Sequence, residues 1–219
     1  MTERLIITPE ADSERLALAD GSASMRFVPR LGLKLPRYHF HVGRIVHASQ
    51  ELDLFRVQTT LLLGNDLTGS AELSDFQARP DLDDTAQAEA FTRLVSAATA
   101  RADSMAERGD SLVAELPGWH DARGQSPFWH ALGARFYRGD PATAQLRLGE
   151  AWRSHLAALL PRQTIYLSFL GGEAEARLGQ PDTSAATIAA ALAACGFKAS
   201  CHVRINDGGP VLRRRLSDG

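Results

Sequence analysis

The chain has 219 residues, of which 44% are hydrophobic, and a formal net charge of −2 with a pI ≈ 6.4. This length allows one large domain or two small ones, and the composition is ordinary for a globular protein. The small net charge argues against a nucleic-acid-binding surface. No apolar stretch approaches the roughly 18 residues that a membrane span needs. The first residues, Met1 to Arg4, do not read as a signal peptide.

The cysteines predict a reduced environment. Cys195 and Cys201 are placed at a helix end and a strand start, which disfavours a disulfide between them and favours a cytoplasmic location. Neither has the spacing of a zinc ligand, so we expect no metal site. The run Arg213-Arg214-Arg215 is short and is expected to be a solvated tail.

In the first half of the chain, the hydrophobic pattern predicts strands and one long helix. Asp20-Gly21 is a strong hairpin-turn signal between two of the strands, and residues 52–56 are ambiguous. A helix is predicted over residues 86–107, with Gly109 ending it. The expected strands are residues 4–8, 16–20, 23–28, 38–47, 58–63 and 72–78.

The second half begins with a strand over residues 112–116 that breaks at Pro117-Gly118. Ser126 is a good helix cap and Pro127 a good first helical residue, so a helix is predicted from there to Gly133, with Phe136-Tyr137 opening the next extended piece. Further helices are predicted over residues 143–160, 172–178 and 184–194, a strand or the start of a helical loop over 165–170, and a last strand over 197–205.

Alternating strands and helices predict an α/β or α+β fold, with a mixed sheet flanked by helices in a single domain over residues 1–219. The loop over residues 64–69 is dense in turn formers, so Asn65 and Asp66 belong either to a substrate loop or to a structural turn. Asp207, in Asn-Asp-Gly-Gly, is likewise a tight-turn residue or a ligand.

Two glutamates are candidates for binding a guanidinium group. Glu72 and Glu115 both lie in strand patterns, where a carboxylate can accept two parallel hydrogen bonds from an arginine. That arginine could belong to a substrate or to the chain itself, in a buried ion pair. Both interpretations are open at the level of sequence.

The histidines offer candidates for acid–base chemistry. His39, His41 and His47 share one strand parity and so one face, as a metal or acid–base patch or as packed histidines. His120 lies in a polar loop beside Asp121 and is a candidate general base. Phe128 and Trp129 are expected in the core.

Several short sequence motifs, taken in order, resemble those of arginine N-succinyltransferases over roughly residues 26 to 212. Together they are more specific than any single motif. The motifs are Val46-His47-Ala48-Ser49, Gly64-Asn65-Asp66-Leu67-Thr68-Gly69-Ser70-Ala71-Glu72-Leu73, Val113-Ala114-Glu115-Leu116, Ser126-Pro127-Phe128-Trp129 and Asn206-Asp207-Gly208-Gly209-Pro210.

The resemblance implies an acyl-CoA N-acyltransferase fold and transfer of a succinyl group from succinyl-CoA to the α-amine of arginine. It also implies that Phe76 stands where the family has a leucine associated with succinyl-CoA. A start later than in the family is expected to shorten the N-terminal side of the sheet, and oligomerisation could cover the edge or face that this exposes.

The chain departs from the family where the donor and the proton would be handled. A glycine-rich loop before a long helix normally offers amides to the CoA pyrophosphate. Residues 79–85 contain no glycine and instead carry Asp81, Asp83 and Asp84, of which Asp83 or Asp84 can cap the helix. The family histidine after Gly-Gln is absent, because Gly179-Gln180 runs directly into Pro181, and a family arginine is replaced by Pro117.

Two hypotheses follow. The first is an acyltransferase acting on arginine or a similar amine, with impaired or lost catalysis. The second is a non-catalytic relative that pairs with a partner protein, or that binds an arginine-like ligand.

Overall fold

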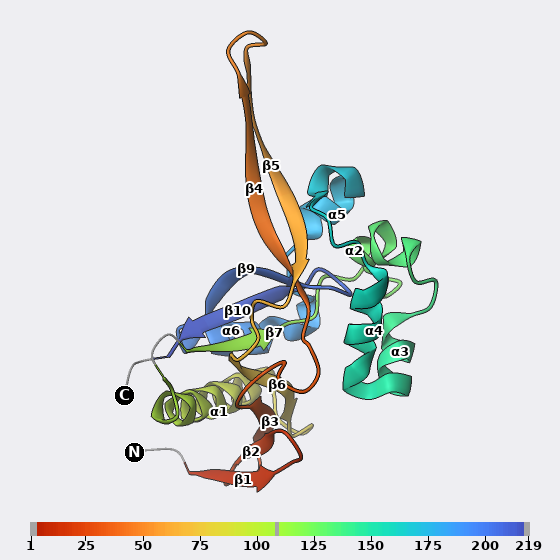
Figure 1. Cartoon of the computed structure of the whole chain (residues 1–219). Coiled ribbons are helices and arrows are strands. Elements are labelled where there is room, and N and C mark those ends of the chain that lie inside the picture. The colour runs from red at the N-terminus through yellow and green to blue at the C-terminus, as the bar shows by residue number, and fades with distance from the viewer. Residues whose placement is uncertain (1–3, 108–109, 217–219) are drawn as a thin grey trace.

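The computed structural model describes residues 4–107 and 110–216 (Figure 1). Short 3₁₀ turns join several helices, and no helix within these ranges is both long and apolar enough to cross a bilayer. The strands are β1 Leu5–Pro9, β2 Glu14–Leu18, β3 Ala23–Val28, β4 His39–Ser49, β5 Leu54–Gly64, β6 Ala71–Ala78, β7 Ser111–Glu115, β8 Ile165–Tyr166, β9 Lys198–Arg204 and β10 Pro210–Arg215. The helices are α1 Asp84–Ser104, α2 Pro127–Ala131, α3 Pro141–Leu148, α4 Trp152–Leu159, α5 Gly172–Arg177 and α6 Ala186–Ala194.

The described strands form one ten-stranded sheet in the order β1-β2-β3-β6-β7-β10-β9-β4-β5-β8. Neighbouring strands are antiparallel except for β6 and β7, which run parallel and are joined through α1. The hairpin predicted at Asp20-Gly21 is confirmed as β2–β3. This mixed sheet with helices confirms the predicted α/β class.

Two apolar cores lie on the sheet. The first packs α1 and α6 against β2, β3, β6 and β7, with Leu94 and Leu192 fully buried. The second packs α2, α3 and α4 against β4, β5 and β9, around Phe40, Phe128 and Trp152. Helices on the left and right of Figure 1 belong to these separate cores.

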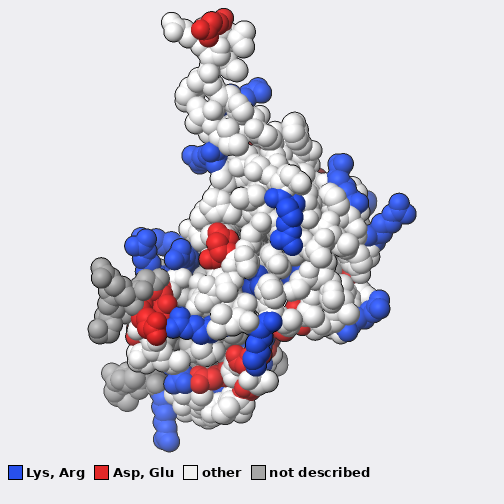
Figure 2. Space-filling model, in the orientation of Figure 1, with Lys and Arg blue, Asp and Glu red and all other residues white. Residues whose placement is uncertain are grey.

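A long hairpin leaves the body of the molecule. At its base, β4 pairs with β9 only from His39 to His41, and β5 pairs with β8 only at Thr60 and Leu61. Beyond these contacts β4 and β5 pair with each other alone, from Val42 to Thr59. Figure 1 shows this segment, here called the arm, rising from the sheet, and Figure 2 shows its largely uncharged surface and acidic tip.

Two helical predictions need correction. The helix expected over residues 143–160 is two helices, α3 and α4, because Gly149 has a φ of 56° that interrupts the helical path. The extended piece expected at Phe136-Tyr137 is absent: both amides donate to the carbonyl oxygen of Gly133, which continues a tight turn. Gly133 itself lies against the Trp129 ring, where no Cβ would fit.

The C-terminal run is not a tail. Arg213, Arg214 and Arg215 lie in β10, between β7 and β9, and pair with residues 111–113 of β7. This strand was missed in the sequence because its charged residues mask the pattern of a central strand. The long helix ends at Ser104, whereas Gly109, expected to end it, lies outside the described residues.

Removing a buried leucine from the first core should be costly. Leu94→Ala is expected to lower the free energy of unfolding by about 2–5 kcal/mol, because Leu94 is fully buried between α1 and the sheet. Leu146→Ala is the matched control, since Leu146 is 88% exposed. Urea denaturation of the two variants measures the difference, and equal stability of both would contradict this packing.

Candidate functional site

A cavity opens where the parallel strands β6 and β7 separate. They pair only from Ala71 to Leu73 and from Leu112 to Ala114, after which β6 continues along β3. The cavity has a volume of about 690 Å³, and its far wall is the α3–α4 connection. At its edge β6 carries a bulge at Asp75, whose φ is 52° and whose carboxylate lies 2.6 Å from Arg15. Such a bulge bends the strand locally.

Glu72 and Glu115 line this cavity and are buried. Nη2 of Arg37 lies 2.6 Å from Glu72 Oε1, and Nε of the same guanidinium lies 2.9 Å from Glu115 Oε1. Nη1 of Arg153 lies 2.6 Å from the other oxygen of Glu115. In this structure arginines of the chain itself pair with both carboxylates.

The ion cluster extends in two directions. His39, fully buried, places Nε2 at 2.8 Å from Glu115 Oε1. On the solvent side, Glu150 bridges Arg37 at 3.2 Å and Arg26 at 2.6 Å. The described cluster therefore alternates positive and negative groups, and its main carboxylates are already satisfied.

Burial and charge act against each other on the carboxyl groups. Burial raises the pKa of Glu115, but Arg153, Arg37 and His39 outweigh it and bring that pKa well below its ordinary value. For Glu72 burial prevails over Arg37, so its pKa is raised. Burial also lowers the pKa of Arg153. The cluster is thus a charged assembly shielded from water. Of its two buried glutamates, Glu72 takes up a proton more readily than Glu115.

The start of α1 carries carboxylates. Asp83 is the N-cap, and its Oδ1 accepts a hydrogen bond of 2.8 Å from the amide of Ala86. Asp81 pairs with Arg79 at 2.6 Å, and Asp84 lies in the first turn of the helix. The predicted capping aspartate is therefore Asp83. Its carboxylate already uses part of the anion-binding capacity of this helix end.

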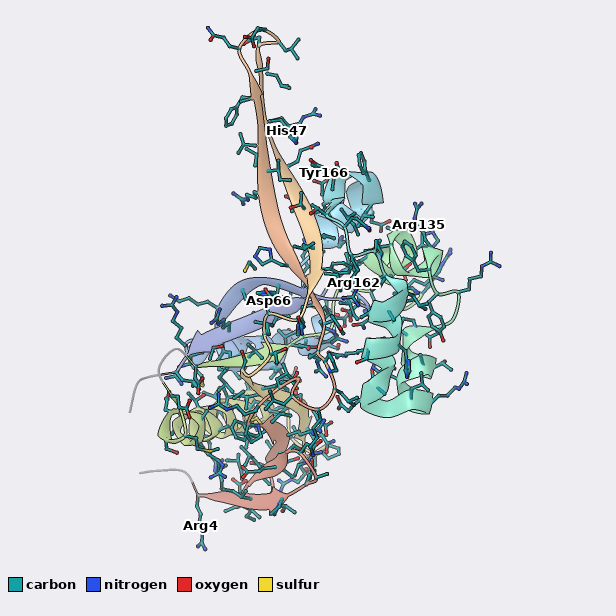
Figure 3. All side chains as sticks on the ribbon, viewed as in Figure 1. Arg4, His47, Asp66, Arg135, Arg162 and Tyr166 are labelled. Carbon is teal, nitrogen blue, oxygen red and sulfur yellow. The ribbon has the colours of Figure 1, made fainter. Side chains whose placement is uncertain are left out.

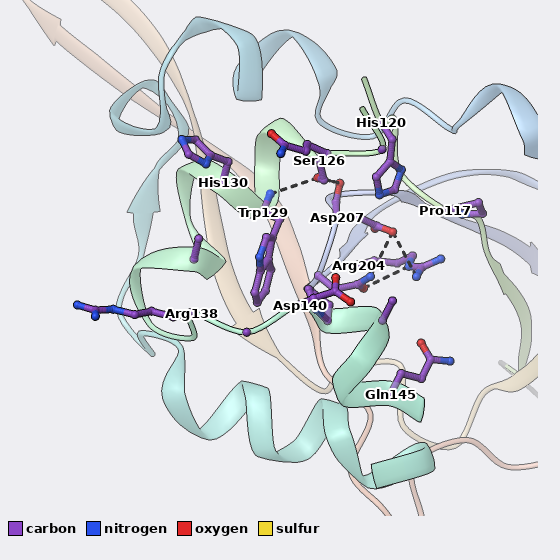
Figure 4. A pocket seen from close by; sticks show the side chains of 17 residues that line it. Pro117, His120, Ser126, Trp129, His130, Arg138, Asp140, Gln145, Arg204 and Asp207 are labelled. Atoms are coloured by element: carbon purple, nitrogen blue, oxygen red, sulfur yellow. Dashed lines mark hydrogen bonds and ion pairs between the residues drawn. The ribbon is translucent and has the colours of Figure 1, made fainter. Parts of the chain in front are cut away.

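A second cavity, of about 550 Å³, is lined by residues between Pro117 and Gln145 and by residues 204, 206 and 207 (Figure 4). The amide of Trp119 donates to the carbonyl oxygen of Gln180, and the amide of Asp182 donates to that of Pro117. Gly118 must be a glycine here, because a Cβ would lie 2.3 Å from the carbonyl oxygen of Asp207. These contacts bring residues 117–121, 179–182 and 206–209 together.

His120 lines this second cavity, but its partner is not the neighbouring Asp121. Its backbone amide donates to Asp182 Oδ2 at 3.2 Å, and its Nδ1 lies 3.7 Å from the same oxygen. Asp121 instead accepts from the amides of Arg123 and Gln125 and holds a local turn. His120 therefore lies beside Asp182, which follows the segment Gln180-Pro181.

Asp207 is a turn residue that also carries an ion pair. Its Oδ1 accepts from the amide of Gly209 at 2.9 Å, and its Oδ2 lies 3.2 Å from Arg204. The hydroxyl of Ser126 caps α2 by accepting from Trp129 and donates to the carbonyl oxygen of Asp207. Figure 4 shows the Trp129 ring forming one wall of the cavity, whereas Phe128 is buried.

The other candidate residues lie outside these two cavities. The carbonyl oxygen of Asn65 accepts from Thr68 in a tight turn. Asp66, near the foot of the hairpin in Figure 3, lies 2.6 Å from Nε2 of the buried His202. Phe76 packs edge-on against Phe91 of α1, with ring centroids 6.2 Å apart.

The three histidines of β4 have separate surroundings. His39 belongs to the ion cluster, His41 contacts His202 with ring centroids 5.3 Å apart, and His47 lies beside Tyr166 on the arm (Figure 3). Within residues 4–107 and 110–216, no three histidine, cysteine or carboxylate side chains are grouped as a metal site.

Sequence reasoning missed the arginines of the site. Arg37 follows Pro36 just before β4, Arg153 lies in α4, and Arg204 ends β9. Their partners lie 35 to 78 positions away in the chain, or further in the case of Arg204 with Glu115. One signal in the sequence pointed to them. Two glutamates lie in strands without a neighbouring cation in the sequence, so that if both are buried, their partners come from distant parts of the chain.

The geometry is that of a mixed sheet with a cavity between two parallel strands, and comparison with known proteins places it in a family. A family model described as "Arginine N-succinyltransferase beta subunit" matches residues 21–218. The chain belongs to the arginine N-succinyltransferase family.

Individual relatives agree. Arginine N-succinyltransferases of Escherichia coli O139:H28 and Escherichia fergusonii are each 36% identical over 182 residues, covering 83% of this chain and 52% of theirs. The chain thus spans about half the length of these relatives. The structure of arginine/ornithine succinyltransferase subunit AI from Pseudomonas aeruginosa aligns with a TM-score of 0.71 and 27% identity, over 95% of this chain and 61% of that one.

Breaking the ion cluster should destabilise the fold. Glu115→Gln leaves Arg37 and Arg153 buried without their shared carboxylate, and the free energy of unfolding should fall by about 3–5 kcal/mol. Glu150→Gln is the control: Glu150 has a side chain 52% exposed, and its loss should cost under about 1 kcal/mol. Chemical denaturation tests this, and similar losses for both variants would contradict it.

The two glutamates should give opposite pH dependences. The lowered pKa of Glu115 provides stability that is present above its ordinary pKa of 4.5 and is lost as the pH falls through its folded-state value. Glu115→Gln should therefore flatten the loss of stability in acid. Glu72 has a raised pKa, so the folded state takes up its proton first and Glu72→Gln should steepen that loss. Unfolding measured across the acid range distinguishes them, and parallel curves would contradict the assignment.

Proposed function

We propose that this chain is an arginine N-succinyltransferase relative in which succinyl transfer from succinyl-CoA to the α-amine of arginine is impaired or lost. The proposal includes an acyl-CoA N-acyltransferase type of fold. The strand pair β6–β7, the bulge at Asp75 and the following helix α1 support that type of fold.

The observation that carries the proposal is the start of α1. A CoA pyrophosphate at a helix N-terminus needs free amides and a positive local field. Here the Asp83 carboxylate accepts from the amide of Ala86, Asp84 adds a second negative charge, and the charge of Asp81 is paired with Arg79. Each like-charge contact with a phosphate costs on the order of 1 kcal/mol in exposed surroundings. Succinyl-CoA, as co-substrate, should therefore bind weakly.

The acceptor side supports the same conclusion. A substrate guanidinium would need carboxylates that are not already paired, yet Arg37 and Arg153 hold Glu72 and Glu115 at hydrogen-bonding distances. Replacing one buried guanidinium by another gains no charge interaction and adds the cost of expelling Arg37 or Arg153 into water. Glu72 and Glu115 thus suit an internal role better than arginine binding.

His120 is the residue that could act as general base in any residual succinyl transfer. It lines the second cavity, and the adjacent Trp119 contacts Gln180, beside the place where the family histidine is absent. The carboxylate of Asp182 lies 3.7 Å from Nδ1 of His120. A general base contributes about 100- to 10000-fold, so His120 alone would not restore a site that binds its donor weakly.

A second candidate function is that of a non-catalytic subunit. The matching family model is named as a beta subunit, and the aligned Pseudomonas structure is named as a subunit of an arginine/ornithine succinyltransferase. A chain that keeps the sheet while its donor site is altered suits pairing with a partner protein. An arginine-like ligand bound for regulation is a further form of this candidate.

Calorimetry tests the proposal directly. CoA and succinyl-CoA are titrated into this chain and, as positive control, into an E. coli relative, with succinylarginine formation measured in parallel. This chain should bind at least about tenfold more weakly, because like-charge contacts at α1 each cost on the order of 1 kcal/mol. Replacing Asp81, Asp83 and Asp84 by asparagine keeps a cap and should strengthen binding, most clearly at low salt.

Tight binding by the unaltered chain, together with turnover of arginine, would show the proposal to be wrong. Weak binding that the asparagine variant does not improve would remove the aspartates as its cause.

A further inference from the structure

The arm has an unused hydrogen-bonding edge. β5 pairs with one side of β4 along its whole length, but β9 covers the other side only from His39 to His41. Within the described residues no strand pairs with that side from Val42 to Ser49. Such an edge presents free N–H and C=O groups and is a template for another strand.

The same segment exposes apolar side chains. Of the sixteen exposed large hydrophobic residues that the described chain shows, five lie on the arm, far above its share of the length. On one face, the cross-strand pairs Val46–Val57 and Ala48–Phe55 lie side by side, and Phe55 is 75% exposed. A cluster of exposed apolar side chains of this kind marks an interaction site.

Neither core of the chain can use these residues, because the arm projects away from the body (Figures 1 and 2). The arm also carries Val46-His47-Ala48-Ser49, a sequence motif that neither cavity employs. Its charges are few: Arg44 and Arg56 lie along the strands, and Glu51 and Asp53 lie at the tip.

We infer that the free edge of β4 on the arm pairs with the same edge of a second copy of this chain, antiparallel and about a two-fold axis near Val46. The pairing would join two hairpins into a four-stranded ribbon. It would also make the apolar faces around Phe55 and Val57 continuous between the copies.

Charge favours a second copy in this antiparallel arrangement. With the axis at Val46, Arg44 lies opposite Ala48 of the partner subunit, and the two copies of Arg44 are four positions apart, or about 13 Å. That exceeds the Debye length of about 8 Å at physiological salt. A parallel arrangement would place both arginines and both acidic tips together.

The size of the contact predicts its strength. The free edge, residues 42–49, is about 26 Å long at roughly 3.3 Å per residue. One edge and part of one face bury a few hundred Å² per partner, below the about 800 Å² of a standard interface. The dimer should therefore dissociate on dilution, and its formation does not depend on whether the cavity between β6 and β7 is active.

Light scattering coupled to gel filtration, run over a range of micromolar concentrations, tests the inference. The unaltered chain should move from monomer to dimer as concentration rises. Val46→Lys places two positive charges at the axis and should weaken the dimer at least about tenfold. Leu148→Lys is the matched control, because Leu148 is 45% exposed on α3, against 56% for Val46, and it should leave the dimer unchanged.

A monomer at every concentration would overturn the inference, as would a dimer that resists Val46→Lys. A chain that stays monomeric alone and associates only with a longer family member would also overturn the choice of a second copy.

A crosslink tests the register. In a Cys201→Ser background, which removes the exposed native thiol, Val46→Cys should form a disulfide-linked dimer under mild oxidation. Opposed residues in antiparallel strands are about 4.5–5.5 Å apart at Cα, within the range that a disulfide spans. Ala48→Cys is the control, since its copies would be about 13 Å apart. Crosslinking of Ala48→Cys in place of Val46→Cys would contradict the axis.

Discussion

The buried ion cluster around Glu115 is the interaction on which the structure depends. Glu72 and Glu115 come from β6 and β7, beside the first core, whereas Arg37 and Arg153 come from the side of the second core. The two apolar cores do not merge, and the ion cluster lies between them, together with the continuous sheet and a small apolar cluster of Leu31, Leu67, Val113 and Val211. Each buried ion would be costly alone, and the cluster is stable only as a complete set.

This arrangement limits what the cavity between β6 and β7 can do. Two of the carboxylates that line it, Glu72 and Glu115, pair with arginines from the side of the second core. Using them for a substrate would release Arg37 or Arg153 and disrupt the joint between the cores. Structural and ligand-binding roles would therefore compete for the same side chains.

Local signals in the sequence were sufficient for much of the fold. The turn at Asp20-Gly21, the cap at Ser126 and the aspartate cap of α1 each depend on a few adjacent residues, and each was predictable. The prediction failed where contacts with residues distant in the sequence determine the local structure. β10 is a strand because β7 and β9 flank it, and the helix of residues 143–160 breaks because a left-handed Gly149 outweighs the apolar pattern.

The site was predictable only in part, for the same reason. Glu72 and Glu115 could be named as guanidinium-binding residues, but whether the guanidinium was internal depended on Arg37, which is 35 positions from one and 78 from the other. His120 could be named as a candidate base, but its partner Asp182 lies 62 positions away. Propensity and spacing carry no information at these separations.

The motifs shared with the family and the departures from them lie in different parts of the molecule. The motifs at Ser126 and Asp207 contribute to the second cavity, Glu115 lines the first, and another motif lies on the arm. The departures are at the start of α1 and at Gln180-Pro181, where donor phosphates and a proton would be handled. The proposal of reduced transfer rests on this division, and above all on the Asp83 carboxylate, which occupies an amide at the start of α1. In that proposal the chain acts through contacts, with chemistry reduced or left to a partner.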